Sequence, residues 1–542
     1  MNRHTLTATK TISSLRQLSV AIAAITCSAS ALALPTVHFD NGFSLQSQLT
    51  ANYTLSTRTG SANSAYLKDP NNDDGTRNFD KWGLINNRVS LFGEVIARYE
   101  NVGAVLRGSH FYDDVYHNTN KNNSPGTVNK AGNHRKFTSK TKERSGGQAR
   151  LLDAYVFGNF TMGDSKYLSV KAGRHLVAWG ESLFWPNISQ GQAPVDATKF
   201  NVPGTEAKDA YLPAGQVSFN LALNEQVTLT GFWQYKWEET LLNPVGDFFG
   251  SDFFGPGSER FYVPDLNGNF DSNAYVTNAG TKKPDNKGQW GVGVRFNPDF
   301  NTEIGLYHYR YHDRTPAVFF GGGSQYSSAK DLGVVDLGTY KFKYFEDIKL
   351  TGMSLSTKIA DAVQVGGDLS LREGAVVNLA NDVGPTTGKI IQTNLNAIYV
   401  LGPSWLSHQT TFMAEVLNER IHSVDTLHIT GGGADASFNK YRSAKQTKSS
   451  SLFGGGIYMD YPSIVQGWDL TTSAVWTQNI SGTGAQGFGR DEKRLTLGAD
   501  FTYKQNFAVG ATLVNFLSSA SVNQNRLMAD RDHLAINLKY TF

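Results

Sequence analysis

The feature that most constrains this fold is an alternation of apolar and polar residues with a period of two. Near the start of the chain, Phe43, Leu45 and Leu49 alternate with polar residues such as Gln48, and residues 534–542 repeat the pattern at the other end. Successive side chains of a strand point to opposite faces. Both segments are therefore predicted to be strands with one apolar and one mostly polar face.

Similar segments recur between these two ends, for example at 227–238 and 494–503. Most span about 10 residues, which is the length that a tilted strand needs to cross a bilayer. By contrast, nothing in the sequence approaches the roughly 20 consecutive apolar residues of a spanning helix. The sequence therefore predicts a protein that crosses a membrane with strands.

The connectors between these segments alternate between short and long, which is typical of an outer-membrane barrel with periplasmic turns and longer extracellular loops. The pattern predicts an all-β fold, a closed antiparallel transmembrane β-barrel of about 18 strands (16–18). Short connectors are expected near 100–101, 161–166, 224–226, 297–301, 359–362, 402–404, 461–467 and 504–506. Long ones are expected near 58–83, 113–148, 177–214, 239–288, 312–347, 373–389, 420–450, 479–492 and 518–530.

The placement of proline supports these boundaries, because proline lacks the N–H group that a sheet interior requires. All 16 prolines fall outside the predicted strands, with Pro298, Pro403 and Pro462 in short turns. The alternative is a soluble chain of several β-sandwiches, which would not need alternating connectors. In hydrocarbon, every backbone polar group must be paired within the protein, so a lipid-facing sheet has to close.

Residues 1–33 are predicted to be a signal peptide, and 34–542 the mature barrel. Three basic residues precede the apolar run 18–25, and Ala31-Leu32-Ala33 provides the small residues of a cleavage site. Without the leader's three basic residues, the 50 Lys and Arg fall level with the 47 Asp and Glu, so a nucleic-acid partner loses its electrostatic basis. Cys27, the only cysteine, lies in the leader, which excludes disulfides and thiolate zinc sites from the mature chain.

Charged residues collect on the polar faces of the strands. They are expected to face the lumen, because a basic side chain at the lipid midplane costs about 2–4 kcal/mol. Basic groups outnumber acidic ones among these residues, which favours an anionic or carboxylate-bearing solute. The alternative is that these charges only line a water-filled barrel and select no solute. The candidate pore-lining arginines are Arg98, Arg107, Arg295, Arg310 and Arg372.

The long connector 177–214 is unusually apolar for a surface loop. Folding it into the barrel mouth would bury its aromatic residues and form a constriction; alternatively, it forms a compact cap on neighbouring loops. In the first case Glu181, Asp196 and Lys199 could form ion pairs with lumen arginines such as Arg174. The predicted gate residues are Arg174, Trp179, Glu181, Trp185, Asp196 and Lys199.

The same connector resembles the Gram-negative outer-membrane family called domain of unknown function 1302 (DUF1302). The similar stretches are Trp179–Asn187, Pro194–Thr198, 202–204, the Asp73–Asp80 region and Pro244–Gly246. One departure is Ile188, where members of the family often have glycine. The resemblance implies an outer-membrane location and a role near hydrophobic-compound or lipid traffic, beside transporters of the resistance–nodulation–division type. It implies no established substrate.

These observations predict a porin-like passive channel for a small or amphipathic solute. The alternative is a non-conducting barrel that serves as a binding, lipid-traffic or structural platform for other envelope proteins. An outer-membrane hydrolase is not favoured: Ser407 and His408 are adjacent on a predicted strand and would face opposite ways. The expected localisation is the Gram-negative outer membrane.

No catalytic residue, functional metal or cofactor is predicted. A structural calcium ion is conceivable at Asp265–Asp271 or at Asp69–Asp74, where oxygen ligands alternate, although neither completes a calcium loop. The expected partners are outer-membrane lipid and lipopolysaccharide, the barrel-assembly machinery, for which the terminal Phe542 resembles the recognition signal, and an inner-membrane transporter system.

Overall fold

The computed structural model describes residues 36–163, 165–191, 193–200, 202, 210–265, 267–321, 325–326, 338–378, 385–425, 429–430, 446–485 and 489–542. The predicted signal peptide lies outside these residues, and so do Pro203 and Gly204 of the family-like motif. No helix in these ranges is both long and apolar enough to span a membrane.

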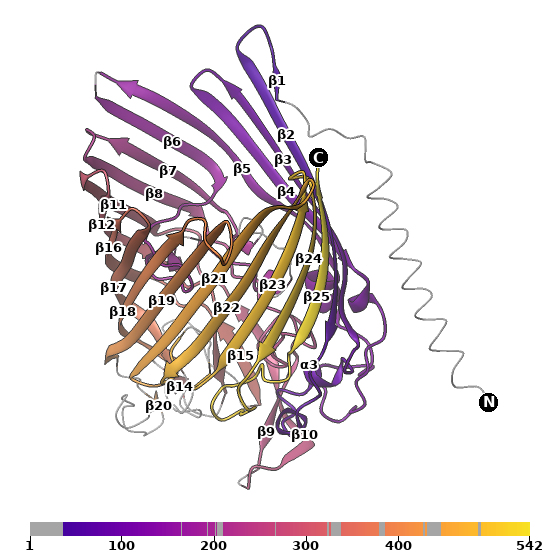
Figure 1. Cartoon of the computed structure of the whole chain (residues 1–542). Coiled ribbons are helices and arrows are strands. Elements are labelled where there is room, and N and C mark those ends of the chain that lie inside the picture. The colour runs from indigo at the N-terminus through magenta and orange to yellow at the C-terminus, as the bar shows by residue number, and fades with distance from the viewer. Residues whose placement is uncertain are drawn as a thin grey trace.

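Eighteen antiparallel strands form a closed barrel, as predicted (Figure 1). Each strand pairs with the next one along the chain, and the barrel closes where Thr50 of the first strand pairs with Thr541 of the last. The strands are β2 (Phe43–Arg58), β3 (Leu84–Tyr99), β4 (Val102–Asp113), β5 (Gly147–Met162), β6 (Lys166–His175), β7 (Ala214–Ala222), β8 (Val227–Lys236), β11 (Gln289–Asp299), β12 (Thr302–Tyr311), β16 (Ile348–Ala360), β17 (Val363–Asn378), β18 (Pro385–Leu401), β19 (Gln409–Val424), β21 (Ser449–Val465), β22 (Trp468–Ser481), β23 (Lys493–Tyr503), β24 (Phe507–Phe516) and β25 (His533–Thr541).

Short turns lie at one end of the barrel and long loops at the other, here called the short-turn end and the long-loop end. The short-turn end also holds the last residue, Phe542, whose N–H donates to Leu49 O over 2.8 Å. Here β1 (Val37–His38) pairs with the start of β2. The wall on the side of β2 to β8 rises further than the side of β21 to β25 (Figure 1), because β2 continues from Thr50 back to Phe43 beyond the end of β25.

Several strands are longer than the expected span of about 10 residues. β17 has 16 residues and β18 has 17, because strands continue past the membrane-spanning length into the loop hairpins. The prediction that every proline lies outside the strands is therefore wrong. Pro298 and Pro462 lie near the short-turn ends of β11 and β21, next to register shifts, and Pro385 is the first residue of β18. These are positions where a missing N–H group is tolerated.

The two faces of the wall follow the predicted alternation. On β23, Leu497 and Phe501 are exposed on the outer face, whereas Thr496 and Asp500 have the opposite parity. Paired residues share a face, so the parity carries from Thr496 to Val514 on the next strand. Exposed apolar side chains on many strands, including Leu106, Val156, Val292, Leu306 and Leu395, form the outer belt.

The long loops contain additional structure that the sequence did not reveal. Four strands form a second sheet, in which β10 and β15 run parallel; β9 and β10 project from the long-loop end (Figure 1). The strands are β9 (Arg260–Pro264), β10 (Phe270–Lys282), β13 (Ala317–Phe320) and β15 (Thr339–Lys343), with a separate pair β14 (Gln325–Tyr326) and β20 (Ile429–Thr430). The short helices are α2 (Ser64–Leu67), α3 (Asp74–Arg77) and α4 (Ser139–Thr141).

Three buried carboxyl groups meet around α3. The N–H of Asp74 donates to Asp252 Oδ2 over 2.8 Å, and Asp73 precedes Asp74 directly. The pKa of Asp74 is raised to about 7, mainly by burial and then by the negative charge of the neighbouring Asp73, while N–H groups of Asn122 and Asn129 oppose the shift. Burial also raises the pKa of Asp252 well above its usual range.

If the arrangement of the faces is correct, an arginine on the outer face destabilises the barrel far more than one on the inner face. We expect Leu497→Arg to lower the free energy of unfolding by about 2–4 kcal/mol, because the guanidinium lies in hydrocarbon. The matched control is Thr496→Arg on the same strand. Residue 496 faces the lumen, so this variant should change the free energy of unfolding much less. Denaturant unfolding in lipid vesicles measures both, and equal losses would contradict the assignment of faces.

The acidic cluster around α3 predicts a pH dependence. A carboxyl group whose pKa is raised in the folded state binds its proton more tightly there than in the unfolded chain. Its stabilising contribution is full below the ordinary pKa of 3.8 and is lost as the pH rises through the raised value near 7. Amide protection at 74–78, corrected for intrinsic exchange rates, should therefore be higher at pH 5 than at pH 8. Asp74→Asn should reduce this difference. Protection that increases with pH would contradict the stabilising role of the protonated Asp74 carboxyl group.

Candidate functional site: a segment across the barrel lumen

After β6, the chain leaves the wall and runs through the lumen. The Trp179 ring lies 5.0 Å from the Phe232 ring of β8 and 5.1 Å from the Tyr307 ring of β12, centroid to centroid. Tyr309, two residues further along β12, is also buried in this cluster, and its hydroxyl donates to Ile188 O. These aromatic residues belong to the inner face, so the segment from Trp179 to Ile188, here called the lumen segment, packs inside the wall.

Two carboxylates of the wall hold the backbone of the lumen segment. Asp368 on β17 accepts from the N–H of Glu181 over 2.8 Å and from the hydroxyl of Ser182 over 3.1 Å. Glu415 on β19 accepts from the N–H of Trp185 over 3.2 Å and also from the N–H of Leu183. A chain that is not in a strand must find partners for its buried N–H groups, and these carboxylates provide them.

Uncharged polar side chains of β17 and β18 complete the docking. Asn187 is fully buried, and its side-chain NH₂ donates to Asn394 Oδ1 over 3.0 Å. Asn394 in turn donates to Trp185 O, and Gln392 donates to Pro186 O, both over 3.0 Å. Ser370 donates to Asn187 Oδ1. Polar side chains on the inner face of β17 and β18 therefore form hydrogen bonds with the lumen segment, in addition to lining the wall.

Glycines of the wall make room for the lumen segment. A Cβ atom on Gly454 of β21 would lie 2.8 Å from the Phe184 ring. Within the segment, Gly180 has a φ of +87°, and a Cβ atom there would lie 2.7 Å from Asp368 Oδ2. A side chain at either position would displace the segment from the wall.

The later part of the predicted connector packs on the opposite side of the lumen. Asp196 forms an ion pair with Arg150 of β5 over 2.7 Å, and it caps the short 3₁₀ turn Ala197–Lys199. Leu212 packs with Phe92 and Leu152 of the inner wall and with Leu241 from the next loop. Both halves of the described connector therefore lie against inward-facing residues.

The predicted gate residues are only partly brought together. Trp179, Glu181 and Trp185 lie in the lumen segment, whereas Asp196 and the buried Lys199 lie with β5 and the loop after β8. Arg174 does not pair with any of the loop carboxylates suggested by the sequence. It pairs with Glu238, so that the pKa of Glu238 lies below its usual value although burial alone would raise it.

Four of the five predicted pore-lining arginines have lumen-face parity, and three of these four pair with carboxylates. Arg107 pairs with Glu94 and Asp153, Arg372 with Glu419 over 3.1 Å, and Arg295 with Glu303 over 3.8 Å. Arg98 shares the parity of Glu94 on β3. Most of the predicted arginine excess is therefore balanced locally.

The prediction that Arg310 faces inward is wrong. On β12, the inward positions belong to Tyr307, Tyr309 and Tyr311, which pack in the cluster of Trp179. Arg310 alternates with them and pairs with Asp347 over 2.5 Å at the long-loop end. The sequence suggested the opposite parity, because large aromatic residues on a barrel strand normally face lipid.

Two wall carboxylates that the sequence analysis did not single out are Glu419 and Asp153. Glu419 has the same parity as Glu415, four residues earlier on β19, and parity counting could have found it. Asp153 could not have been found in this way. The β4–β5 pairing shifts register between Leu106 and Gly108, so that Leu152 and Asp153, although adjacent, both contact inward groups. A bulge of this kind has no reliable signature in a single sequence.

The lumen segment covers only one side of the lumen. On β17 to β19, Asp368, Gln392 and Glu415 are all nearly fully buried. On β22 and β23, inward-facing residues such as Ser473 and Thr496 remain half-buried. Along this part of the wall, the described loops leave inward-facing side chains accessible.

Among the described residues, His175 and Ser218 form a serine–histidine contact that the sequence did not suggest. His175 Nε2 lies 2.7 Å from Ser218 Oγ, but both side chains are buried in the wall and His175 Nδ1 contacts its neighbour Gly173 O. Ser407 and His408, predicted to lie on a strand, precede β19, and Ser407 bonds Thr410. Neither arrangement has the form of an exposed nucleophile with its base.

Within the described ranges, no three His, Cys, Asp or Glu side chains are placed to share a metal ion. Asp265 accepts from the N–H groups of Asn267 and Asn269, both over 2.8 Å, as in an ordinary turn. In the second predicted calcium cluster, Asp69 accepts from the N–H of Asn71 over 2.9 Å. A structural calcium ion stays a prediction.

The described chain is thus a closed antiparallel β-barrel of 18 strands with a loop segment packed in its lumen. The chain belongs to the family described as "Protein of unknown function (DUF1302)", whose model matches residues 14–542. This confirms the resemblance seen in the sequence.

Several solved structures match this chain over nearly their whole length at low identity. OccAB1 of Acinetobacter baumannii is 10% identical, with 95% of this chain and 99% of that chain covered and a TM-score of 0.44. OccK9 (OpdG) of Pseudomonas aeruginosa is 10% identical, with 92% and 98% covered and a TM-score of 0.43. The outer membrane protein OpdK of the same organism is 10% identical, with 92% of this chain and 98% of that chain covered and a TM-score of 0.40. No curated protein sequence matches.

The docking of the lumen segment predicts the effect of removing its main acceptor. We expect Glu415→Ala to lower the amide protection of residues 183–185 by tenfold or more, because each lost hydrogen bond to a carboxylate contributes about 1.5–3 kcal/mol. The barrel strands should keep their protection. Hydrogen exchange followed by mass spectrometry measures both, with Glu303→Ala on β12 as control. Unchanged protection at 183–185 would show that the carboxylate does not hold the segment.

Proposed function

We propose that this protein resides in the Gram-negative outer membrane, with the short-turn end facing the periplasm and the long-loop end facing outward. There it acts as a passive channel for a small or amphipathic solute, whose passage the lumen segment restricts. The proposal places the signal peptide at residues 1–33, and it includes outer-membrane lipid, lipopolysaccharide and the barrel-assembly machinery as surroundings and partners.

The observation that carries the proposal is the one-sided docking of the lumen segment. It narrows the barrel by packing on β8, β12, β16 to β19 and β21, yet inward-facing residues of β22 and β23 stay partly accessible. A segment that only sealed the barrel would be expected to cover the whole circumference of the lumen. We therefore assign the route of the solute to the side of β22 and β23.

The solute preference follows from what lines this side. Arg494 and Asp500 of β23 share the inner face with Thr496 and Ser473, so the accessible wall is mostly polar and carries both signs of charge. Together with the local pairing of the arginines, this favours a small polar or amphipathic solute over a strongly charged one. A carboxylate-bearing or largely apolar solute stays within the proposal, and so does a link to an inner-membrane transporter.

A second candidate is a non-conducting platform for other envelope proteins. The long-loop end supports it: Phe248 is fully buried in a cluster with Phe79 and Tyr116, and Arg58 pairs with Asp530 beneath it over 2.7 Å. These contacts fill part of the barrel mouth, and the sheet containing β9 and β10 offers a surface outside it. No catalytic role is proposed.

The channel proposal predicts that removing the lumen segment increases conductance. His175 and Ala214 are directly paired, so a two-residue Asn-Gly turn can replace 176–213 without changing the register of β6 and β7. In planar bilayers we expect discrete openings from the natural chain and larger ones from this variant. Faster migration of the unboiled protein on gels verifies that the variant folds. Silent bilayers from both folded forms would favour the platform.

A further inference from the structure

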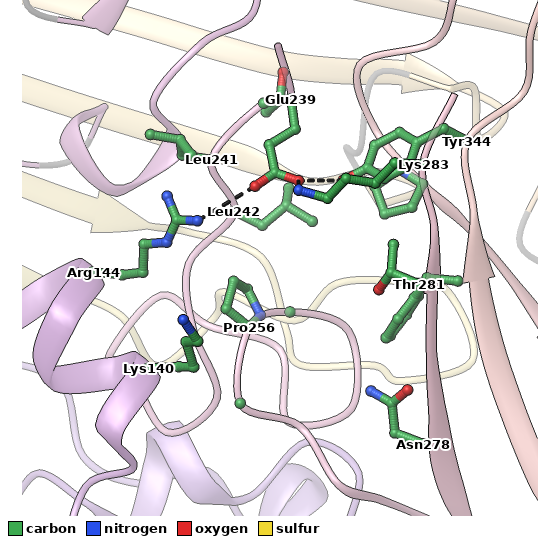
Figure 2. Close-up of a pocket in the computed structure, with 15 residues that line it drawn as sticks. Lys140, Arg144, Glu239, Leu241, Leu242, Pro256, Asn278, Thr281, Lys283 and Tyr344 are labelled. Carbon is green, nitrogen blue, oxygen red and sulfur yellow. Dashed lines mark hydrogen bonds and ion pairs between the residues drawn. The ribbon is translucent and has the colours of Figure 1, made fainter. Parts of the chain in front are cut away.

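A separate cavity of about 290 Å³ lies among the loops of the long-loop end (Figure 2). The cavity is lined by residues 140–144 before β5, 239–242 and 255–257 after β8, 278–283 in and after β10, Pro316, and 342–344 in and after β15. Its volume is near the lower end of the range of small-molecule pockets, about 300 Å³. The proposed channel does not account for it.

The lining combines cationic groups with an apolar surface. Lys140, Arg144 and Lys283 carry the positive charges. Leu241, Leu242, Pro256, Pro316 and Phe342 provide apolar contact. A pocket of this composition suits a molecule with an anionic end and an apolar body.

The cavity already holds one carboxylate, that of Glu239. Figure 2 shows Arg144 and Lys283 reaching it from two sides; the ion pairs measure 3.3 and 2.9 Å. The Tyr344 hydroxyl donates to the same carboxylate over 3.3 Å, and burial raises the pKa of Tyr344, so it remains a donor at physiological pH. The edge of Trp237 packs on Tyr344 with 4.8 Å between ring centroids, which fixes the phenol.

The cavity keeps cationic groups that could bind an added anion beyond those that pair with Glu239. The Nε atom of Arg144 is buried and has no acceptor among the described residues. Lys140 pairs with Glu143, which is not part of the lining. Three cations thus face two carboxylates, which leaves one positive charge in excess. A carboxylate in the cavity could accept from the terminal nitrogens of the Arg144 guanidinium, one of which already pairs with Glu239.

We propose that this cavity is a binding site for a small organic monocarboxylate with an apolar, aromatic or aliphatic, body. The carboxylate binds Arg144 with support from Lys140, and the body packs on the apolar wall that includes Leu242 and Phe342. The site is distinct from the lumen segment, and its occupation does not depend on whether the barrel conducts.

Titration calorimetry on the purified full-length barrel in detergent tests this site, with benzoate as the probe. We expect saturable binding of benzoate and none of benzyl alcohol, which has a similar body without the charge. Arg144→Gln should weaken benzoate binding by about tenfold, equivalent to 1.4 kcal/mol. Glu239→Gln should strengthen it, because the internal competitor for Arg144 and Lys283 loses its charge.

Lys121→Gln is the matched control, since Lys121 forms only an exposed 4.0 Å ion pair with Asp80, and binding should not change. If Arg144→Gln fails to fold, Lys283→Gln takes its place, with weaker binding expected. Equal binding of benzyl alcohol, an unchanged affinity in the folded charge variant, or displacement of benzoate by inorganic phosphate at similar concentration would each overturn the assignment of a monocarboxylate site.

Discussion

The structure depends on the requirement that backbone N–H and C=O groups have partners wherever water is absent. In a lipid-facing sheet, this requirement forces closure, and the pairing of β2 with β25 satisfies it. The same requirement applies in the lumen, where the chain from Glu181 to Asn187 is not part of a strand. Asp368, Glu415 and Asn394 take the place of a neighbouring strand and hold this backbone from the wall.

Period-two alternation predicted the strands, and the alternation of short and long connectors predicted an antiparallel barrel of about 18 of them, because closure in lipid leaves few alternatives. It failed where an inward position carries an apolar side chain. On β12, the tyrosines face the lumen because Trp179 packs on them, and this reversed the expected orientation of Arg310. On β5, a register shift changed the parity around Asp153. In both cases tertiary contacts determine the face, and local sequence does not contain them.

The candidate site was predicted in part. The apolar residues of the connector 177–214 indicated that it needs a place out of water, and Trp179 and Trp185 are indeed buried. The sequence could not indicate which groups would receive it. In the sequence, polar residues such as Gln392 and Asn394 cannot be distinguished from residues that only line a water-filled lumen, because the segment that they bind is distant in the chain. The ion pairs of the arginines likewise join residues on different strands, for example Arg372 with Glu419.

The sequence separation of these contacts has a consequence for biogenesis. The N–H of Glu181 meets a carboxylate 187 residues further along the chain, and that of Leu183 meets one 232 residues away. Neighbouring strands, by contrast, can pair hairpin by hairpin, at a much smaller entropic cost of loop closure. The wall that receives the lumen segment does not exist until β17, β18 and β19 have been added. Insertion of this segment is thus a late step of maturation, after most of the cylinder has been assembled.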